Sequence, residues 1–167
     1  MSIPFKPLAA AAALLACAAC GTGGQPASQA ADAAGAAAAL AGTSWRLQEI
    51  GSMDDATGST LPGAGRTYTV HFGVDGRAAF QLDCNRGTAS YTSAATDAQG
   101  GRLGFGNVAM TRAMCPEGSL DNRVARDMAL VRAYVLRGQT LTMSMTADSG
   151  LYVWTRDGAA AAAGPAR

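Results

Sequence analysis

Histidine and lysine are almost absent from this chain of 167 residues, which holds one histidine, His71, and one lysine, Lys6. A zinc site would need His71, both Cys84 and Cys115, and a further ligand, and no C-x-x-C pair occurs beyond residue 20. A cysteine–histidine nucleophile pair would depend on the same single histidine. The sequence therefore disfavours both kinds of site, and we interpret His71 as a half-exposed residue on the polar face of a strand.

The sequence also lacks an excess of charge of either sign and the short motifs of common enzymes. Removing Lys6 from the 13 basic residues leaves 12 arginines against 12 acidic residues. No basic stripe predicts nucleic-acid binding, and no polybasic cluster predicts binding to anionic lipid. The G-x-S-x-G pattern of serine hydrolases does not occur, and the glycines of GTGGQ lie in a linker, where they cannot form a phosphate loop. We expect no catalytic activity, no metal and no cofactor.

The first residues predict export. The apolar run LAAAAALLACAAC follows Lys6, is too short to span a bilayer and is typical of a bacterial signal peptide, which we place at residues 1–16. Residues 14–17, LLAC, resemble a lipobox, in which cleavage precedes a cysteine that is then acylated. We expect acylation at Cys17, with Cys20 as the alternative first residue. A soluble secreted protein cut at an A-x-A-like site is the other alternative.

The composition divides the rest of the chain into a linker, one domain and a tail. Residues 17–41 are rich in alanine and glycine and contain no aromatic residue, so they cannot bury enough apolar surface to offset their ordering entropy. We interpret them as a flexible tether, and residues 158–167 as a disordered tail of the same character. The folded unit is expected at residues 42–157. No aspartate follows Cys17 or Cys20, which favours an outer-membrane lipoprotein that faces the periplasm.

Short alternating segments predict strands throughout the folded unit. In TYTVHF, Tyr68, Val70 and Phe72 alternate with polar residues, and Asp75-Gly76 is typical of a two-residue hairpin turn between two apolar runs. Similar segments recur to the end of the domain. The pattern predicts an α+β fold, mainly antiparallel β, in which about seven or eight strands form a small curved sheet or a barrel-like domain.

One segment has a helical period instead. In residues 119–135, apolar residues recur at spacings of three and four, at Leu120, Val124, Met128, Val131 and Val135. We therefore predict one amphipathic helix over about 119–135, with Ser119 as its N-cap and Gly138 just past its end. This helix is expected to close the open end of the barrel-like sheet.

The segments around the later cysteines carry a family resemblance. CNRGTASY and VAMTRAMCPEG, framed by GTSWRL and LTMSMTADSGLYVW, resemble the META/HslJ family of bacterial envelope lipoproteins over about residues 40–156. The resemblance implies a compact antiparallel domain with one helix, and a role in heat shock, novobiocin resistance and envelope integrity, without an established catalytic activity. Family members commonly carry an aromatic residue and a glycine where Gly87 and Ala89 stand here.

The cysteine pair itself is expected to be structural. An exported domain meets an oxidising compartment, where two cysteines normally form a disulfide, so we predict a Cys84–Cys115 bridge. It would close a loop of about 30 residues and contribute roughly 3 to 4 kcal/mol in the chain-entropy model.

Four polar residues flank the two cysteines and form the candidate binding patch: Asn85, Arg86, Thr111 and Arg112. In one interpretation they contact an anionic or carbonyl-rich partner. In the other, Asn85 and Thr111 satisfy main-chain groups at strand ends, while the arginines cover apolar surface or pair with Asp83 and Glu117.

The partners that we expect are the membrane, through the N-terminal lipid, and a periplasmic protein or a small hydrophobic ligand. We expect a monomer that does not bind nucleic acid. A lysozyme-inhibitor-like binding module is the alternative to a META/HslJ role.

Overall fold

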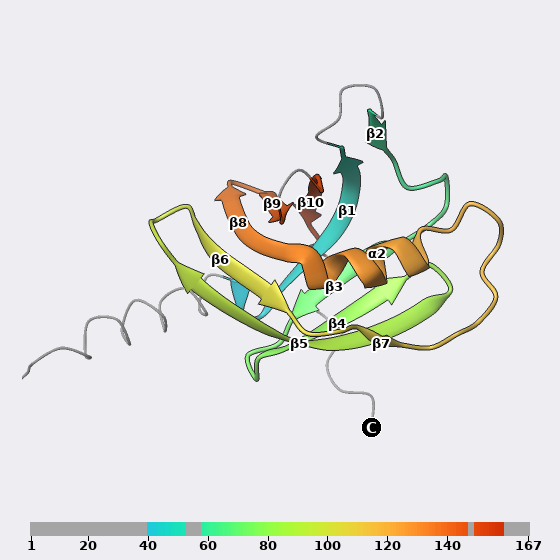
Figure 1. Ribbon diagram of the computed structural model, residues 1–167, viewed down its shortest axis with the longest axis horizontal. Helices are drawn as coiled ribbons and strands as arrows, with labels where there is room; N and C mark the ends of the chain where they lie inside the picture. The colour runs from blue at the N-terminus through green and yellow to red at the C-terminus, as the bar shows by residue number, and fades with distance from the viewer. Residues whose placement is uncertain (1–39, 53–57, 147–148, 159–167) are drawn as a thin grey trace, which may run out of the picture.

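The computed structural model describes residues 40–52, 58–146 and 149–158 (Figure 1). The predicted signal peptide, both candidate acylation sites, most of the tether and most of the tail lie outside these residues. The described strands are β1 (Thr43–Gly51), β2 (Ser59–Thr60), β3 (Tyr68–Phe72), β4 (Arg77–Leu82), β5 (Asn85–Ala95), β6 (Gly100–Phe105), β7 (Ala109–Met110), β8 (Val131–Arg137), β9 (Thr140–Met145) and β10 (Leu151–Arg156). The α-helix α2 (Asp121–Asp127) continues into a 3-10 turn (Met128–Leu130).

Eight of these strands form a closed antiparallel ring. The order is β10-β9-β8-β6-β5-β4-β3-β1, and β1 also pairs with β10, which closes the ring within the described residues. The two-residue strands β2 and β7 lie off the ring, paired with β1 and β5. Closure leaves few unpaired strand edges. The predicted α+β, mainly antiparallel, barrel-like architecture is confirmed.

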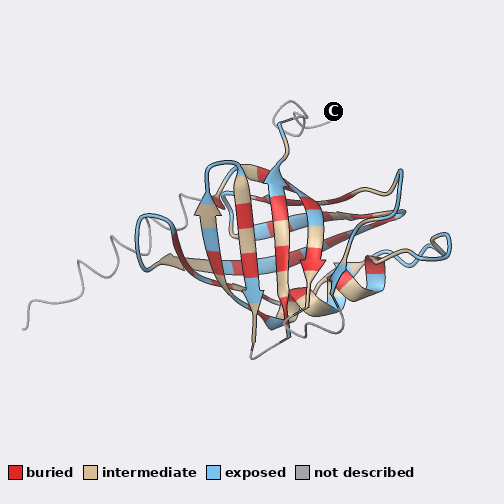
Figure 2. Ribbon diagram, turned by 90° about the horizontal axis from the view of Figure 1, so that it is seen from above, coloured by how far each residue is buried: buried red, intermediate tan, exposed pale blue. Residues whose placement is uncertain are grey.

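Alternation of side chains fills the barrel, as the bands of buried residues along the strands show (Figure 2). In β3, Tyr68, Val70 and Phe72 are buried as predicted. In β1 the strict alternation breaks: a register shift between Leu47 and Glu49 turns Ile50 inward in place of Glu49. A β-bulge of this kind inserts one residue and reverses which face the following side chains occupy.

The predicted turn at Asp75-Gly76 lies between β3 and β4. The Gly73 amide donates to the Arg77 carbonyl at 2.8 Å, which closes a loop of residues 74–76. Gly76 has a φ of 76°, a left-handed conformation that glycine adopts without steric cost. The Asp75 carboxylate accepts from the Arg77 amide at 3.1 Å. The predicted hairpin is present, but its loop has three residues and not the predicted two, with glycine at the left-handed position.

The predicted helix at 119–135 is too long. The α-helix ends at Asp127, and the chain from Val131 onward is strand β8, paired with both β6 and β9. The spacing of four between Val131 and Val135 fits a helical face, but an even spacing also fits one face of a strand, so the period does not discriminate between them. Cross-strand pairing on both sides decides the conformation of this segment.

The predicted helix boundaries are also wrong at both ends. The N-cap residue is Leu120, whose amide donates to the Tyr68 hydroxyl at 2.7 Å. Ser119 lies one residue earlier and accepts from the Asp121 amide at 3.4 Å. Gly138, with a φ of 59°, belongs to the turn between β8 and β9. A tyrosine hydroxyl from a distant strand thus accepts a hydrogen bond from a main-chain amide at the start of the helix. This contact cannot be predicted from the local sequence.

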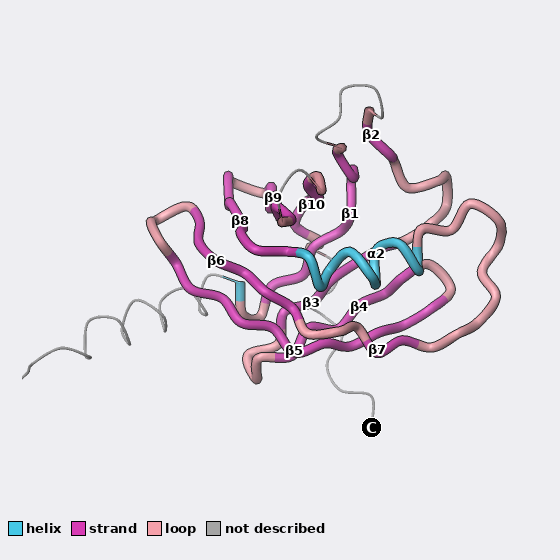
Figure 3. The backbone as a smooth tube through the Cα atoms, viewed as in Figure 1, coloured by secondary structure: helices cyan, strands magenta, loops and turns pink. Residues whose placement is uncertain are grey.

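The helix α2 lies across one end of the barrel, between the β3–β4–β5 side and β8 (Figure 3). Its buried residue Val124, together with Met128 of the following 3-10 turn, joins the hydrophobic core. Tyr152 of β10 donates its hydroxyl hydrogen to Asp127 Oδ2 at 2.8 Å. Tyrosines from two different strands, Tyr68 and Tyr152, therefore hold the start and the end of the helix.

No helix of the described residues has the length and apolar character needed to cross a membrane.

Replacing Tyr152 with phenylalanine is expected to reduce the free energy of unfolding at pH 7 by about 1.5 to 3 kcal/mol, the contribution of a hydrogen bond to a charged group. Burial and the Asp127 charge raise the pKa of Tyr152 above its ordinary value of 10.0. In wild type this tyrosine therefore contributes stability that is present below about pH 10 and lost as pH rises further, because the unfolded chain ionises first. The Tyr152→Phe variant has no hydroxyl group at this position to ionise, so its stability does not fall for this reason at high pH.

Urea unfolding at pH 7 and at alkaline pH measures both effects, and the difference between wild type and variant should narrow above pH 10. Tyr91→Phe is the matched control at pH 7, because the Tyr91 hydroxyl donates to the Gly73 carbonyl away from α2. It is no control at alkaline pH, because burial and the Asp75 charge raise the pKa of Tyr91 as well. An equal difference between wild type and Tyr152→Phe at both pH values would contradict the assignment.

The chain enters and leaves the barrel at the end opposite α2. Trp45 of β1 pairs with Arg156 of β10, and the Arg156 guanidinium lies 4.6 Å from the centre of the Trp45 ring. Thr43 pairs with Phe72, at the far end of β3 from Tyr68. The side chain of Leu40 is already buried in the core. The helix-covered end of the barrel is therefore distant from both the incoming and the outgoing chain.

Candidate functional site

The two cysteines of the domain meet beside the start of α2. β4 and β5 are joined by the turn Asp83-Cys84, in which Asp83 has a φ of 56°, a conformation that aspartate adopts more readily than most residues. This turn places Cys84 against Cys115, and they form a disulfide with Cα atoms 5.5 Å apart. The predicted bridge is present, and it links the β4–β5 hairpin to the segment that enters α2.

Asn85, the first residue of β5, is fully buried and connects three segments. Its side-chain Nδ2 donates to the Ala113 carbonyl at 3.1 Å and to Asp121 Oδ2 at 2.9 Å, and lies 3.3 Å from Cys115 Sγ. Its Oδ1 accepts from the Thr111 hydroxyl and the Ala113 amide, both at 2.8 Å. Because its donors and its acceptor are engaged inside the protein, Asn85 is a structural residue and contributes no accessible surface.

The rest of the predicted patch lies at the surface around the disulfide. The Thr111 hydroxyl accepts from the Arg86 amide at 3.0 Å, and the Thr111 amide donates to the Arg86 carbonyl at 2.9 Å. Both residues line a shallow depression of about 370 Å³, which also includes Gly87. Arg112 lines a different and larger groove. The structure therefore gathers the four predicted residues but divides them between a buried network and two separate surfaces.

Gly87 leaves room for a neighbouring side chain. A Cβ atom at Gly87 would lie 2.7 Å from Val108 Cγ1, so no larger residue fits while Val108 holds this position. Val108 belongs to the connection between β6 and β7 and packs against the core. The aromatic residue that the family commonly carries after the Cys-Asn pair is absent here, and Val108 occupies the space over β5.

Arg66, and neither Arg86 nor Arg112, contacts Asp83 and Glu117, and at Glu117 it contacts the main-chain carbonyl in place of the expected carboxylate. Its guanidinium lies 2.5 Å from Asp83 Oδ2 and donates to the main-chain carbonyl of Glu117. Arg66 is 17 and 51 residues from these partners in sequence, so only the fold brings them together. Neither Arg86 nor Arg112 forms an ion pair within the part of the chain that the structure describes.

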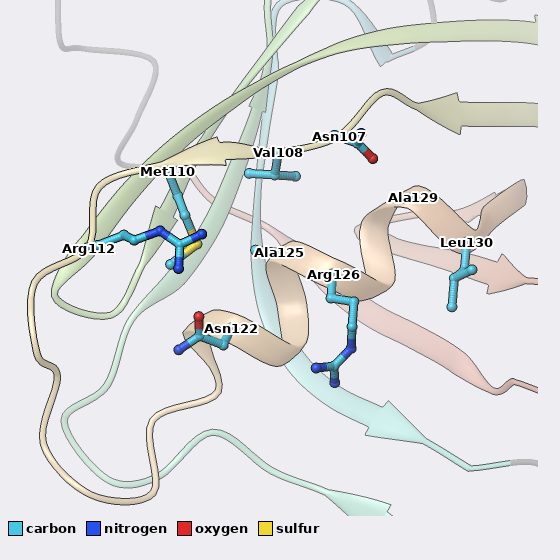
Figure 4. Close-up of a pocket in the computed structure, with 9 residues that line it drawn as sticks. All are labelled: Asn107, Val108, Met110, Arg112, Asn122, Ala125, Arg126, Ala129 and Leu130. Atoms are coloured by element: carbon cyan, nitrogen blue, oxygen red, sulfur yellow. The ribbon is translucent and has the colours of Figure 1, made fainter.

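The larger surface feature, which we call the β7–α2 groove, lies between the strand β7 and the helix (Figure 4). Its volume is about 620 Å³, within the range of ligand-binding sites. Its lining residues are Asn107, Val108, Met110, Arg112, Asn122, Ala125, Arg126, Ala129 and Leu130. In Figure 4 the Arg112 side chain extends from the strand side toward the helix, while the Arg126 side chain projects from the helix on the side away from β7.

The sequence-based prediction identified only Arg112 among these residues. Asn122 and Arg126 are four residues apart, a spacing that places both on one face of a helix, and this was the available signal. The opposite wall could not be recognised in the same way, because Asn107 and Val108 lie in an irregular connection between two short strands. The groove arises from tertiary packing of the helix beside β7.

The META domain profile matches residues 38–158, which is most of the chain. The chain belongs to the META domain family. Among curated proteins, no sequence matches it.

Two solved structures are similar to this META domain protein. The NMR structure of a protein from Burkholderia xenovorans is 22% identical, covers 93% of this chain and 99% of its own, and has a TM-score of 0.57. At this identity the likeness shows a shared fold alone. The crystal structure of a DUF4847 family protein from Bacteroides vulgatus is 10% identical, covers 70% of this chain and 93% of its own, and has a TM-score of 0.47.

The chemistry offered by this META domain suits recognition. His71 lies on the outer face of β3, with its Nδ1 2.9 Å from the Ser44 hydroxyl of β1. Among the described residues, no three histidine, cysteine or acidic side chains are placed to hold a metal ion. The β7–α2 groove combines two arginines, two asparagines and an apolar floor, and no acidic residue lines it. Such a lining favours a partner with an anionic group beside apolar surface.

Proposed function

We propose that this META domain protein is a lipid-anchored, non-enzymatic protein of the cell envelope that contributes to envelope integrity and to tolerance of stress and of novobiocin-type drugs. The family match over residues 38–158 is the observation that carries the proposal. The lipobox-like LLAC segment supports an anchor at Cys17, or at Cys20 as the alternative. The Cys84–Cys115 disulfide supports export, because such bonds persist in oxidising compartments.

The arrangement of the chain is compatible with an outer-membrane anchor. The barrel receives its N-terminal segment at the end opposite α2, so a tethered barrel would present α2 and the β7–α2 groove to the periplasm. A flexible tether of residues 17–39, ahead of the buried Leu40, would have a root-mean-square length of about 24 to 29 Å. That length allows the barrel to leave the membrane surface and meet periplasmic partners.

Acylation is tested by the mass and the fractionation of the full-length protein. We expect the detergent-extracted chain to begin at an acylated Cys17 or Cys20, and replacement of that one cysteine by serine to move the protein from the membrane to the soluble fraction. Cys84→Ala/Cys115→Ala is the matched control and should stay in the membrane fraction. The anchor would be refuted if the Cys17→Ser variant and the Cys20→Ser variant both stayed in the membrane fraction and neither carried the mass of an acyl group.

The physiological part of the proposal is tested in the source bacterium. Deletion of the gene is expected to increase sensitivity to heat and to novobiocin, and the wild-type gene should restore tolerance. A non-acylated but exported variant should restore it only partly, if the anchor places the domain where it acts. Unchanged sensitivity to both stresses in the deletion strain would count against the proposal.

A periplasmic binding module is the second candidate, and the β7–α2 groove is the observation that favours it. The groove is large enough for a ligand, is lined by cationic and apolar residues and lies away from the tether. This candidate leaves open a role in envelope stress, because binding of a periplasmic partner could be the means by which the protein acts.

A further inference from the structure

The β7–α2 groove borders an unpaired sheet edge. β6 pairs with β8 through Gly100–Arg102, but the chain before Val131 turns away as α2 and its 3-10 turn. β7, which follows β6, pairs with β5 and with no other strand in the described part of the chain. The position beside β7 where a further strand would lie is therefore bordered by the helix, and between them is the groove (Figure 4).

The pairing register shows which main-chain groups face this edge. The Thr111 amide donates to the Arg86 carbonyl, and Met110 lies opposite Gly87. In an antiparallel pair, residues that exchange hydrogen bonds alternate with residues whose amide and carbonyl point away. The main-chain amide and carbonyl of Met110 therefore point away from β5 and toward the groove.

The strand side of the groove ends at a free cation. Arg112 follows directly after the paired residue Thr111, is exposed, and forms no ion pair within the described residues. Its side chain extends toward the helix side of the groove, where Asn122 lies (Figure 4). Val108, Ala125 and other apolar residues form the floor. The groove thus offers a strand edge, apolar surface and one cation at its end.

We propose that the β7–α2 groove binds the C-terminal end of an extended peptide from another protein. The peptide adds as a strand beside β7 and pairs with the main-chain groups of Met110. Its terminal carboxylate contacts Arg112, and its last apolar side chain packs on the floor. Because Arg112 lies beyond the C-terminal end of β7, the peptide runs parallel to β7. Strand addition supplies affinity that depends little on sequence, and the carboxylate contact supplies selectivity for chain ends.

This inference is independent of acylation and of drug tolerance, since it concerns binding by the groove alone. The test uses the full-length protein in detergent and an array of hexapeptides attached by their N-termini, with every residue type at each of the last two positions. A matched array carries C-terminal amides. We expect peptides with an apolar last residue and a free carboxylate to bind. Their amidated counterparts should bind more weakly by a factor of about ten or more.

Variants locate the binding to the groove. Arg112→Gln is expected to weaken binding of the selected peptide by about tenfold, while Arg137→Gln, which removes an exposed arginine near the turn between β8 and β9, should leave it unchanged. Both side chains are exposed, so neither variant should affect folding, and thermal unfolding checks this. Amide exchange followed by NMR should show slower exchange of the Met110 amide when peptide is added, because that amide becomes hydrogen-bonded.

Three outcomes would overturn the proposal. One is binding that does not distinguish free carboxylates from amides, or no binding by either array. Another is binding that Arg112→Gln leaves unchanged. The third is displacement of the selected peptide by hexanoate at the peptide's own concentration, which would show a site for small apolar anions without strand pairing. Loss of peptide binding would leave the envelope role intact, since that role is measured by fractionation and by stress sensitivity.

Discussion

Replacing Asn85 with alanine is expected to lower the free energy of unfolding by about 3 to 5 kcal/mol, because a buried carboxylate loses a donor and several further hydrogen bonds are lost with it. The Asn85 side chain is fully buried and provides a donor to the Asp121 carboxylate at 2.9 Å. Asp121 is itself only 5% exposed. Without the amide, this buried carboxylate loses a partner that water cannot readily replace.

The loss of stability in Asn85→Ala should affect α2 as well as β5. Asn85 connects β5 to Thr111, which follows β7, and to Asp121 in the first turn of α2. A domain with a total stability of about 5 to 15 kcal/mol would lose a large share of it. Urea unfolding followed by circular dichroism measures the effect, and Asn107→Ala is the matched control, because Asn107 is exposed in the β6–β7 connection.

An aspartate at position 85 separates the shape of the side chain from its donors. Asn85→Asp keeps the size and the acceptor oxygen but places a second carboxylate beside Asp121, where the native amide donates at 2.9 Å. Because like charges in a buried site repel, we expect a loss at pH 7 at least as large as that of Asn85→Ala. A loss below about 1 kcal/mol in either variant would mean that water or main-chain movement replaces the amide.

Local pattern is sufficient for much of this fold. The alternation in TYTVHF predicts the buried face of β3, and the Asp75-Gly76 pair predicts the hairpin that follows, because both depend on residues adjacent in sequence. The end of the helix could not be predicted in this way. Val131 and Val135 fit a helical face as well as a strand, and the choice depends on pairing with β6 and β9.

The candidate site, too, could be predicted only in part from the sequence. The disulfide follows from the number of cysteines and the expected compartment, and the four flanking polar residues do lie around it. Their roles could not be assigned, because burial of Asn85 depends on Asp121, which is 36 residues away. Arg66, which binds Asp83 and the carbonyl of Glu117, gives no signal in sequence. The β7–α2 groove depends on where the helix packs, and that is a property of the closed barrel.

Removing the disulfide is expected to lower the free energy of unfolding by about 3 to 4 kcal/mol, through greater freedom of the unfolded chain. Cys84 and Cys115 are 31 residues apart, and this separation sets the size of the closed loop. The Cys84→Ala/Cys115→Ala variant should therefore have a melting temperature lower by roughly 10 to 20 °C. Reductant should lower the wild-type melting temperature by a similar amount and leave the variant unchanged, which is the internal control.

A double-mutant cycle with Thr111→Val tests whether the bridge acts on the unfolded or the folded state. The Thr111 hydroxyl holds Asn85 Oδ1 at 2.8 Å, so its loss should cost about 1 kcal/mol in the folded state without exposing the core. If the disulfide acts on the unfolded chain, the two losses should add to within about 0.5 kcal/mol. A coupling energy above about 1 kcal/mol would instead show that the bridge holds the Asn85 network in place, because only a shared native geometry makes neighbouring changes non-additive.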